Sequence, residues 1–423
     1  MNSVLFQINN NKQKISFLLI CLLMFFPMFE VKTNSKIILF FFIFSVVLNF
    51  KKGINSIKNT PLKGLVINSL FFLLLIVSII YTSDKNTGLK IITRQLSFIL
   101  FPIIVFYFIN LTKKQLIILA KLFVLANVLS VLYLCFKLSE NVSILEVATN
   151  NFDFRSIINT GTYKDWHPTY ISAFILTSII LLIESCYSVS KKAYKALVIV
   201  IVIALSLFLF MLNSRAVVYS YIIIIPVYIF IKTKTLKGRV IFLLLCIPFL
   251  VGFYYLLMNN FSLNYRLVLQ LEKVYTWLTN ATVSTSGIDG RYFINQCNTN
   301  LFLNNPFLGY GIGDVSYNLS NCYLDMEFIE LYENNLNTHN NYFYLLLSGG
   351  LITLCAFLVL IINNMILSIK TKNYAYFFVL TLLMVVFLTE TFFERLNGII
   401  FFSAFNSLYY YYVSNFQKLN NEY

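Results

Sequence analysis

Charged side chains are scarce in this sequence of 423 residues, and their scarcity excludes a soluble globular protein. Only 12% of the residues are charged, whereas 59% are apolar. Soluble domains are about one quarter charged and a little under half apolar. A soluble fold would need an apolar core larger than a chain of this length can enclose. The sequence therefore predicts an integral membrane protein.

Motifs that hold metals or nucleotides, or that mark common hydrolases, are also missing. No CxxC, HExxH, Walker A, GxSxG or suitably placed DxD motif occurs. Most cysteines fall in apolar runs, but Cys297 and Cys322 lie in a long polar segment. We expect no metal and no cofactor. The sequence leaves open whether these two cysteines form a disulfide.

Apolar stretches long enough to cross roughly 30 Å of hydrocarbon recur along the chain. They predict an all-α polytopic membrane protein of about 12 transmembrane helices, since each stretch is long and nearly free of charge. We place the helices at residues 15–29, 37–50, 64–82, 95–110, 115–136, 168–187, 194–212, 216–231, 240–258, 341–363, 374–390 and 396–416.

The distribution of charge predicts which side of the membrane each loop occupies. Most lysines and arginines fall on the side of the N-terminus, whereas all the acidic residues except Glu184 and Glu422 fall on the other side. Basic loops stay in the cytoplasm, so we expect both termini to be cytoplasmic. The net charge of +15 is thus a signature of topology, and it predicts a lipid bilayer rather than nucleic acid as the partner.

Two outer loops are long, at residues 137–167 and 259–340. The second is expected to form a folded cap with a helix at 261–279, a short amphipathic helix at 291–304 and a glycine-rich turn at 306–314. We divide the chain into helices one to nine (1–258), this cap (259–340), and helices ten to twelve with a cytoplasmic tail (341–423).

Two arginines on the outer side are candidates for binding an anion. Arg215 follows Asn213 and Ser214, either of which can cap the next helix, so its guanidinium would lie beside a positive helix end that suits phosphate. Arg291 opens the short amphipathic helix of the cap. The alternatives are an arginine that reaches to lipid headgroups for Arg215 and a solvated loop arginine for Arg291.

Both histidines of the chain precede predicted outer helix ends. His339 lies before helix ten, and His167 lies before helix six, where Asp165 can cap the helix and Pro168 fits its first turn. A helix N-terminus disfavours imidazolium, which keeps a histidine neutral and able to accept a proton. The alternative for each is a histidine hydrogen-bonded at the membrane interface.

Other polar groups have simpler interpretations. Asp325, Glu327, Glu330 and Glu333 suit a solvated helix face, and Glu390 and Glu394, at the end of helix eleven, suit a local ion pair with Arg395. A transporter is the rival class, but the predicted helices hold almost no acids and no matched pair of broken helices.

Three segments together resemble the bacterial O-antigen ligase and O-antigen polymerase superfamily. They are 211–217 (MLNSRAV), 290–314 (GRYFINQCNTNLFLNNPFLGYGIGD) and 338–350 (THNNYFYLLLSGG), in the family's order around a large outer loop. The resemblance covers roughly residues 165–400. The segment from His167 to Tyr170 also looks like a subgroup of these proteins.

The resemblance implies a membrane glycosyltransferase of the GT-C-like class with a helical periplasmic cap. It implies an inner-membrane enzyme whose active site faces the periplasm, with His339, Arg215 and Arg291 as catalytic residues. The two arginines would also bind substrate, and we assign substrate binding to His167 and Asn340 as well. The arginines, His339 and His167 are expected to converge in one outward-facing pocket.

The implied reaction is a metal-independent, inverting transfer from an undecaprenyl-diphosphate-linked glycan. The acceptor would be lipid A–core for a ligase in lipopolysaccharide biosynthesis, or a second lipid-linked glycan for a polymerase. Transfer to a protein hydroxyl and glycan transport without catalysis are the further alternatives.

Overall fold

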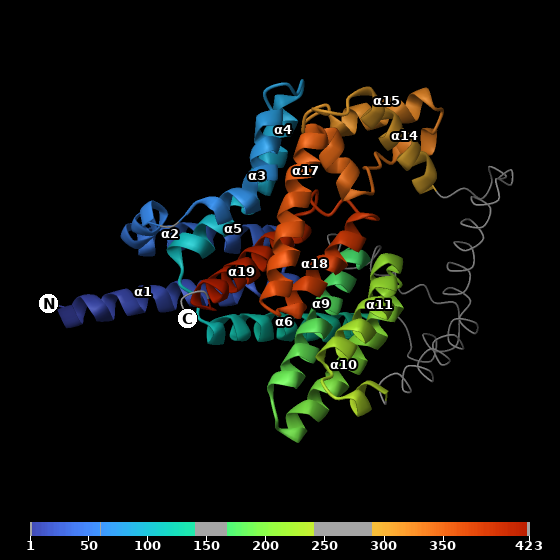
Figure 1. Cartoon of the computed structure of the whole chain (residues 1–423). Coiled ribbons are helices and arrows are strands. Elements are labelled where there is room, and N and C mark those ends of the chain that lie inside the picture. The colour runs from blue at the N-terminus through green and yellow to red at the C-terminus, as the bar shows by residue number, and fades with distance from the viewer. Residues whose placement is uncertain (1, 60, 140–166, 241–289, 421–423) are drawn as a thin grey trace. The chain divides into compact units, whose positions relative to one another are not determined.

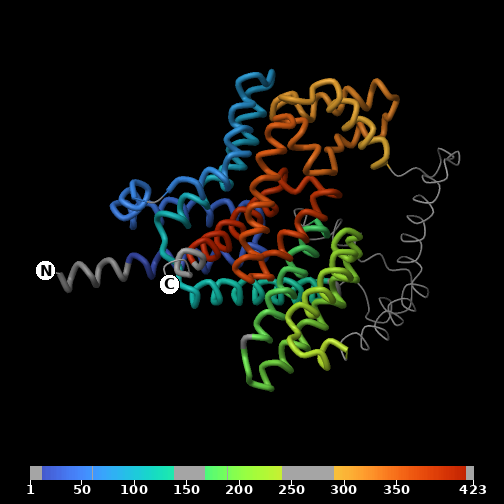
Figure 2. The backbone as a smooth tube through the Cα atoms, viewed as in Figure 1, coloured from blue at the N-terminus to red at the C-terminus, as the bar shows by residue number. Residues whose placement is uncertain are grey.

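The computed structural model describes residues 2–59, 61–139, 167–240 and 290–420 (Figures 1 and 2). In this part of the chain the regular structure is helical throughout. The protein consists of two compact units, Met1–Ala126 with Gly290–Tyr423, and Asn127–Asp289. The boundary falls inside helix α6, so the residues of α6 after Ala126 belong to the second unit.

The first unit contains the N-terminal helices, the described part of the cap and the C-terminal helices. Its elements are α1 (Asn2–Leu23), η1 (Phe26–Met28), α2 (Val31–Asn59), α3 (Lys63–Ser78), α4 (Lys85–Gln95), α5 (Ser97–Ile103), η2 (Ile104–Phe108), α6 (Lys113–Ser139), α14 (Gly290–Asn304), α15 (Val315–Asp325), α16 (Ile329–Glu333), α17 (Asn341–Lys370), α18 (Tyr374–Phe387) and α19 (Leu396–Asn420). The second unit contains α9 (Pro168–Ser188), α10 (Lys192–Leu212) and α11 (Arg215–Lys232).

The helical content and the long apolar helices confirm a multi-pass membrane protein. Seven helical segments in the described residues are long and apolar enough to cross a membrane, and α3 and α18 are apolar but shorter. A total of twelve is not confirmed. The predicted helix at 240–258 and the cap helix at 261–279 lie outside the described residues.

Several predicted helix boundaries are wrong, and two of these helices are interrupted near a proline. A single helix was expected at 15–29, but α1 ends at Leu23 and a 3-10 turn that contains Pro27 follows. Proline has no N–H and cannot extend the helix through this point. The helix expected at 95–110 is interrupted after Gln95, and its last turn, Ile104–Phe108, is a π-helix. Pro102 lies two residues before that turn and removes an α-helical hydrogen bond.

Aromatic rings form the centre of the first unit. Phe98 of α5 contacts Phe71 of α3 with ring centroids 5.1 Å apart, and it contacts Phe393 at 4.6 Å. Phe393 belongs to the turn between α18 and α19, and its ring also packs on Phe71, on Phe357 of α17 and on Phe402 of α19. Because Phe393 is fully buried, this short turn is fixed to four helices.

A cluster of amides joins four helices deeper in the same unit. Asn364 of α17 donates to Asn68 of α3 (2.9 Å) and Asn406 of α19 (2.8 Å), and Asn406 also donates to Asn68 (2.8 Å). The Tyr376 hydroxyl of α18 donates to Asn406 at 2.8 Å. Paired amides hold transmembrane helices together where the hydrophobic effect offers no driving force between them.

Helix α17 is broken at Gly349 and Gly350, and the glycine-rich turn fills the break. Gly350 has a φ of 71° and a ψ of −172°, a conformation that only glycine adopts readily. The Leu351 N–H donates to the carbonyl of Pro306 (2.8 Å), and the Tyr310 N–H donates to the carbonyl of Leu347 (2.7 Å). The turn predicted at 306–314 is therefore present, and it replaces hydrogen bonds that α17 loses.

The same turn is attached to the loop between α3 and α4. The carboxylate of Asp314 accepts from the backbone N–H groups of Ser83 (2.6 Å) and Asp84 (2.9 Å), and the Gly313 N–H donates to Thr82 Oγ1 (3.1 Å). The cap thus rests on two parts of the helical body that lie far apart in sequence.

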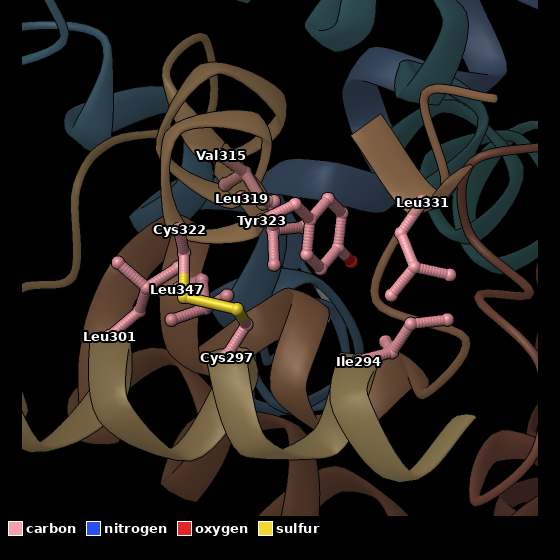
Figure 3. Close-up of a cluster of buried hydrophobic side chains, with 9 residues drawn as sticks. All are labelled: Ile294, Cys297, Leu301, Val315, Leu319, Cys322, Tyr323, Leu331 and Leu347. Carbon is pink, nitrogen blue, oxygen red and sulfur yellow. A yellow bond between two sulfur atoms is a disulfide. The ribbon is translucent and has the colours of Figure 1, made fainter. Parts of the chain in front are cut away.

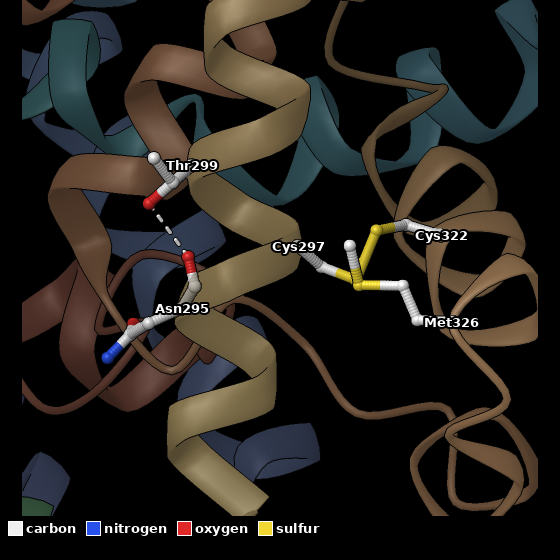
Figure 4. The surroundings of a disulfide bond; sticks show 5 residues. All are labelled: Asn295, Cys297, Thr299, Cys322 and Met326. Atoms are coloured by element: carbon white, nitrogen blue, oxygen red, sulfur yellow. Dashed lines mark hydrogen bonds between the residues drawn. A yellow bond between two sulfur atoms is a disulfide. The ribbon is translucent and has the colours of Figure 1, made fainter.

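The described part of the cap has its own small core (Figure 3). Helix α14 contributes Ile294, Cys297 and Leu301, while α15 contributes Leu319 and others. A disulfide joins Cys297 to Cys322 across these helices (Figure 4), with Cα atoms 5.9 Å apart. The disulfide that the sequence left open is therefore present. The predicted amphipathic helix at 291–304 is α14.

In the second unit, α9, α10 and α11 are joined by turns of a few residues, so that α9 and α11 run in the same direction. An ion pair confirms this at their C-terminal ends: Lys232 of α11 lies 2.6 Å from the carboxylate of Glu184 of α9, which also accepts from the Tyr228 hydroxyl. The N-termini of α9 and α11 therefore share the opposite end of this unit.

The break in α17 yields a stability prediction. Gly350→Ala places a methyl group against the carbonyl of Phe307 in a backbone conformation that disfavours alanine. We expect a loss of about 2–4 kcal/mol, measured as a lower midpoint of thermal unfolding in detergent.

Gly88→Ala in α4 is the matched control. Its added methyl group would lie 3.5 Å or more from its neighbours, and alanine favours helix over glycine by about 1 kcal/mol. Equal midpoints for the Gly350→Ala variant and the native protein would contradict this account of the break.

Candidate active site

His339 lies in a tight turn directly before α17. Its φ is +43°, a left-handed conformation that is uncommon for residues other than glycine and needs support from its surroundings. The support begins with Asn337, whose Oδ1 accepts the backbone N–H of His339 at 3.0 Å. Asn340 then caps the helix, since its Oδ1 accepts from the N–H groups of Tyr342 (2.9 Å) and Phe343 (3.2 Å). The predicted position of His339 at a helix N-terminus is therefore confirmed.

Thr338 anchors the turn in the body of the protein. It is fully buried, its carbonyl accepts from Asn298 Nδ2 of α14 at 3.0 Å, and its hydroxyl lies 2.8 Å from that of Thr391. The neighbouring Asn341 accepts the Phe393 N–H at 3.0 Å. The turn before α17 is thus held between a cap helix and the turn that joins α18 to α19.

Asn340 has a structural task that the sequence analysis did not assign to it. Its side-chain oxygen caps the helix, which leaves the side-chain NH2 group as the part that a substrate can contact. Substrate binding by Asn340 stays a prediction.

Arg291 is the second residue of α14 and is half-buried. It shares a helix face with Ile294 and Asn298, because these residues follow Arg291 by three and seven positions. Asn298 is the residue that bonds the turn before His339, and Arg291 lies two helical turns, about 10 Å, from it along α14. The structure thus connects Arg291 and His339 through one helix of the same unit.

Arg215 is the first residue of α11, as predicted, and it is half-buried. The predicted cap is wrong in one respect. Asn213 ends α10 in a left-handed conformation with φ 48°, and Ser214 occupies the N-cap position without a side-chain hydrogen bond to the helix. No capping side chain of these two residues therefore covers the positive end of α11 beside the Arg215 guanidinium.

His167 occupies the N-cap position of α9, and Pro168 is in the first turn as expected. The imidazole of His167 packs edge-on against the Tyr170 ring, with centroids 5.9 Å apart. Because α9 and α11 run in the same direction, His167 and Arg215 lie at one end of the second unit. The proposed cap residue Asp165 lies outside the described residues.

The structure places Arg291 and His339 in the first unit and Arg215 and His167 in the second. Convergence of all four side chains in one pocket stays a prediction.

Glu394 is a polar residue whose setting the sequence analysis missed. Helix α18 ends at Phe387, earlier than predicted, so Glu390 and Glu394 lie in the turn that follows it. Glu394 accepts from Asn337 Nδ2 at 2.5 Å, a contact with the histidine turn rather than only a local ion pair with Arg395. Burial raises the pKa of the Glu394 carboxyl to about 7. The signal in the sequence was a pair of acids, Glu390 and Glu394, directly after an apolar helix.

These features define a membrane protein whose polar chemistry gathers at helix ends and in a folded cap. In a comparison with protein families, a family model described as O-antigen ligase matches residues 199–358, from within α10 to within α17. This match confirms the resemblance to the O-antigen ligase and polymerase superfamily, whose members are glycosyltransferase-like enzymes. A search of curated proteins finds no match.

The two histidines yield a prediction that separates a catalytic role from a structural one. We expect His339→Ala to abolish surface glycan in a complemented deletion strain, because no other group replaces the imidazole at that turn. We expect His167→Ala to reduce the glycan several-fold. Polysaccharide gels with immunoblots for expression measure both. Wild-type glycan from a well-expressed His167→Ala variant would reduce His167 to an interface residue.

Proposed function

We propose that the protein transfers a glycan from undecaprenyl diphosphate to an acceptor hydroxyl on the outer face of the bacterial inner membrane. The observation that carries the proposal is the placement of His339 at the N-terminus of α17, with its turn hydrogen-bonded to α14, the helix whose second residue is Arg291. The family match over residues 199–358 supports the same reaction class.

In the proposed reaction the acceptor oxygen attacks the anomeric carbon while the bond from that carbon to the diphosphate breaks. His339 accepts the proton of the acceptor hydroxyl, a task for which a neutral imidazole is suited. The diphosphate leaves with the bonding electrons and carries its negative charge away with it.

Arg215 and Arg291 would neutralise that developing charge. Guanidinium groups bind phosphate oxygens in a bidentate manner, and preorganised positive groups at the leaving oxygen are often the largest contribution to such catalysis. Arg215 adds the positive end of α11 to its own charge. In this scheme no resident metal is required.

The disulfide supports an outer position for the cap. Structural disulfides such as Cys297–Cys322 form in oxidising compartments and are rare in the cytoplasm. The periplasm is the oxidising side of the inner membrane. The charge distribution predicts the same side independently, and lipid-linked glycans are consumed there in this family.

We favour a ligase with lipid A–core as the acceptor, because the matching family model carries that description. A polymerase that joins lipid-linked repeats is the second candidate, since it uses the same donor chemistry. Polysaccharide gels of a deletion strain separate the two. Loss of a ligase leaves long chains unattached to core, whereas loss of a polymerase leaves a single repeat attached.

The arginines provide the sharper test. Lysine keeps the charge but loses the bidentate fork, so we expect Arg215→Lys and Arg291→Lys each to lower transfer by about 100-fold or more. Arg239→Lys is the matched control, because Arg239 stacks on Phe230 and lies beyond the C-terminal end of α11. Normal glycans and lipid-linked intermediates in the deletion strain would refute the proposed function.

A further inference from the structure

The hydrogen bonds around Asn337 fix the orientation of its amide. A carboxylate can only accept a hydrogen bond and a backbone N–H can only donate one. Asn337 Nδ2 must therefore face Glu394 Oε2 (2.5 Å), and Oδ1 must face the His339 N–H (3.0 Å). Thr391 Oγ1 also donates to Oδ1, at 3.3 Å. The carboxylate and the histidine turn are thus linked through one side chain.

We propose that Glu394 is a positioning residue for His339, acting through Asn337. This inference rests on the proposed function and assigns a task to a residue that lies outside the three motifs. The charged carboxylate holds the Asn337 amide in the one orientation that leaves its oxygen to the His339 N–H. That bond in turn keeps His339 in its left-handed conformation, and hence keeps its imidazole directed at one place.

The turn that carries Glu394 is rigid enough for this task. Phe393 is buried among the rings of four helices, and its N–H donates to Asn341 Oδ1 at 3.0 Å. Its carbonyl accepts from Gln95 Nε2 at 2.9 Å. The carbonyl of Glu394 itself accepts from Arg94 Nη1 at 3.0 Å. The backbone on both sides of the carboxylate is therefore fixed by α4 and α17.

Burial, one hydrogen bond and several neighbouring charges set the pKa of the Glu394 carboxyl. Burial raises its pKa to about 7; the Asn337 hydrogen bond lowers it, the charge of Glu390 raises it, and the charges of Arg395 and Arg94 lower it. The hydroxyl groups of Tyr323 in α15 and Tyr344 in α17 are also close enough for their charged forms to interact with it.

Opposite signs are expected for stability and for transfer. The folded pKa of about 7 lies above the ordinary value for glutamate, so the ionised carboxylate costs stability as pH rises from about 4 through 7. Transfer requires that same ionised form and falls as pH drops through 7. A residue with only a structural role would change both quantities in the same direction.

The first variant is Glu394→Gln, which removes the charge and keeps the shape. We expect kcat at pH 8 to fall about tenfold, because a neutral hydrogen bond holds the Asn337 amide less firmly than a charge-assisted one. KM for the acceptor should change little. The thermal midpoint of the variant at pH 8 should equal or exceed that of the native protein. The fall in transfer between pH 8 and pH 6 that titration of Glu394 causes in the native protein should be absent from the variant. Glu330→Gln, at an exposed position of the cap, is the control.

The second variant is Asn337→Asp, which places two carboxylates in contact. We expect transfer at pH 8 to fall about 100-fold as the histidine turn shifts, with partial recovery at lower pH when the pair shares a proton. The double variant Asn337→Asp with Glu394→Gln exchanges donor and acceptor between the two positions. It should recover transfer to within about fivefold of the native protein, since the carboxylate at 337 can accept both the amide at 394 and the His339 N–H.

The assay uses the purified full chain in nanodiscs with undecaprenyl-diphosphate-linked glycan extracted from the deletion strain and lipid A–core as acceptor. No transfer by the native protein with this acceptor or with a second lipid-linked glycan would overturn the proposed function. If the native protein transfers glycan, either of two results would overturn the inference and leave the proposed function in place. One is a Glu394→Gln variant with the pH profile of the native protein. The other is a double variant that is no more active than Asn337→Asp.

Discussion

A histidine with positive φ must be held in place by its neighbours, and His339 is such a residue. The N–H of His339 is held by Asn337, the preceding Thr338 is buried and bonded to α14, and the following Asn340 caps α17. Three different segments thus fix one residue. A base that must meet an acceptor hydroxyl gains from such fixing, because small displacements from the reactive geometry are costly.

The rest of the first unit holds the partners of that turn in register. Phe393 locks the turn between α18 and α19 into the aromatic core, and the break at Gly350 lets the glycine-rich turn join α17. The Cys297–Cys322 disulfide ties α14 to α15. The hydrogen bond from Arg94 to the Glu394 carbonyl links residues 300 positions apart in sequence, so distant core substitutions can reach the site.

Much of the helical pattern could be predicted from the sequence, because twenty or so apolar residues in lipid have few alternatives to a helix. The N-termini at His167, Arg215 and His339 follow from the same pattern. The break in α17 could not be predicted, because a Gly-Gly pair inside an apolar run is common in membrane helices. The bond from Asn337 to Glu394 could not be predicted, because local spacing suggested an ion pair with Arg395, whereas Asn337 lies 57 residues away. Pairing across such distances is decided by tertiary packing.

The most direct test is glycan transfer by purified protein, with the native chain, His339→Ala and Arg291→Lys compared in single-turnover reactions on lipid-linked donor. We expect the native chain to form glycosylated acceptor and to release undecaprenyl diphosphate. Each variant should lose both products together, while His339→Ala still binds the donor. Product formation by His339→Ala at the native rate would contradict the account, because the fixed histidine would then have no part in the reaction.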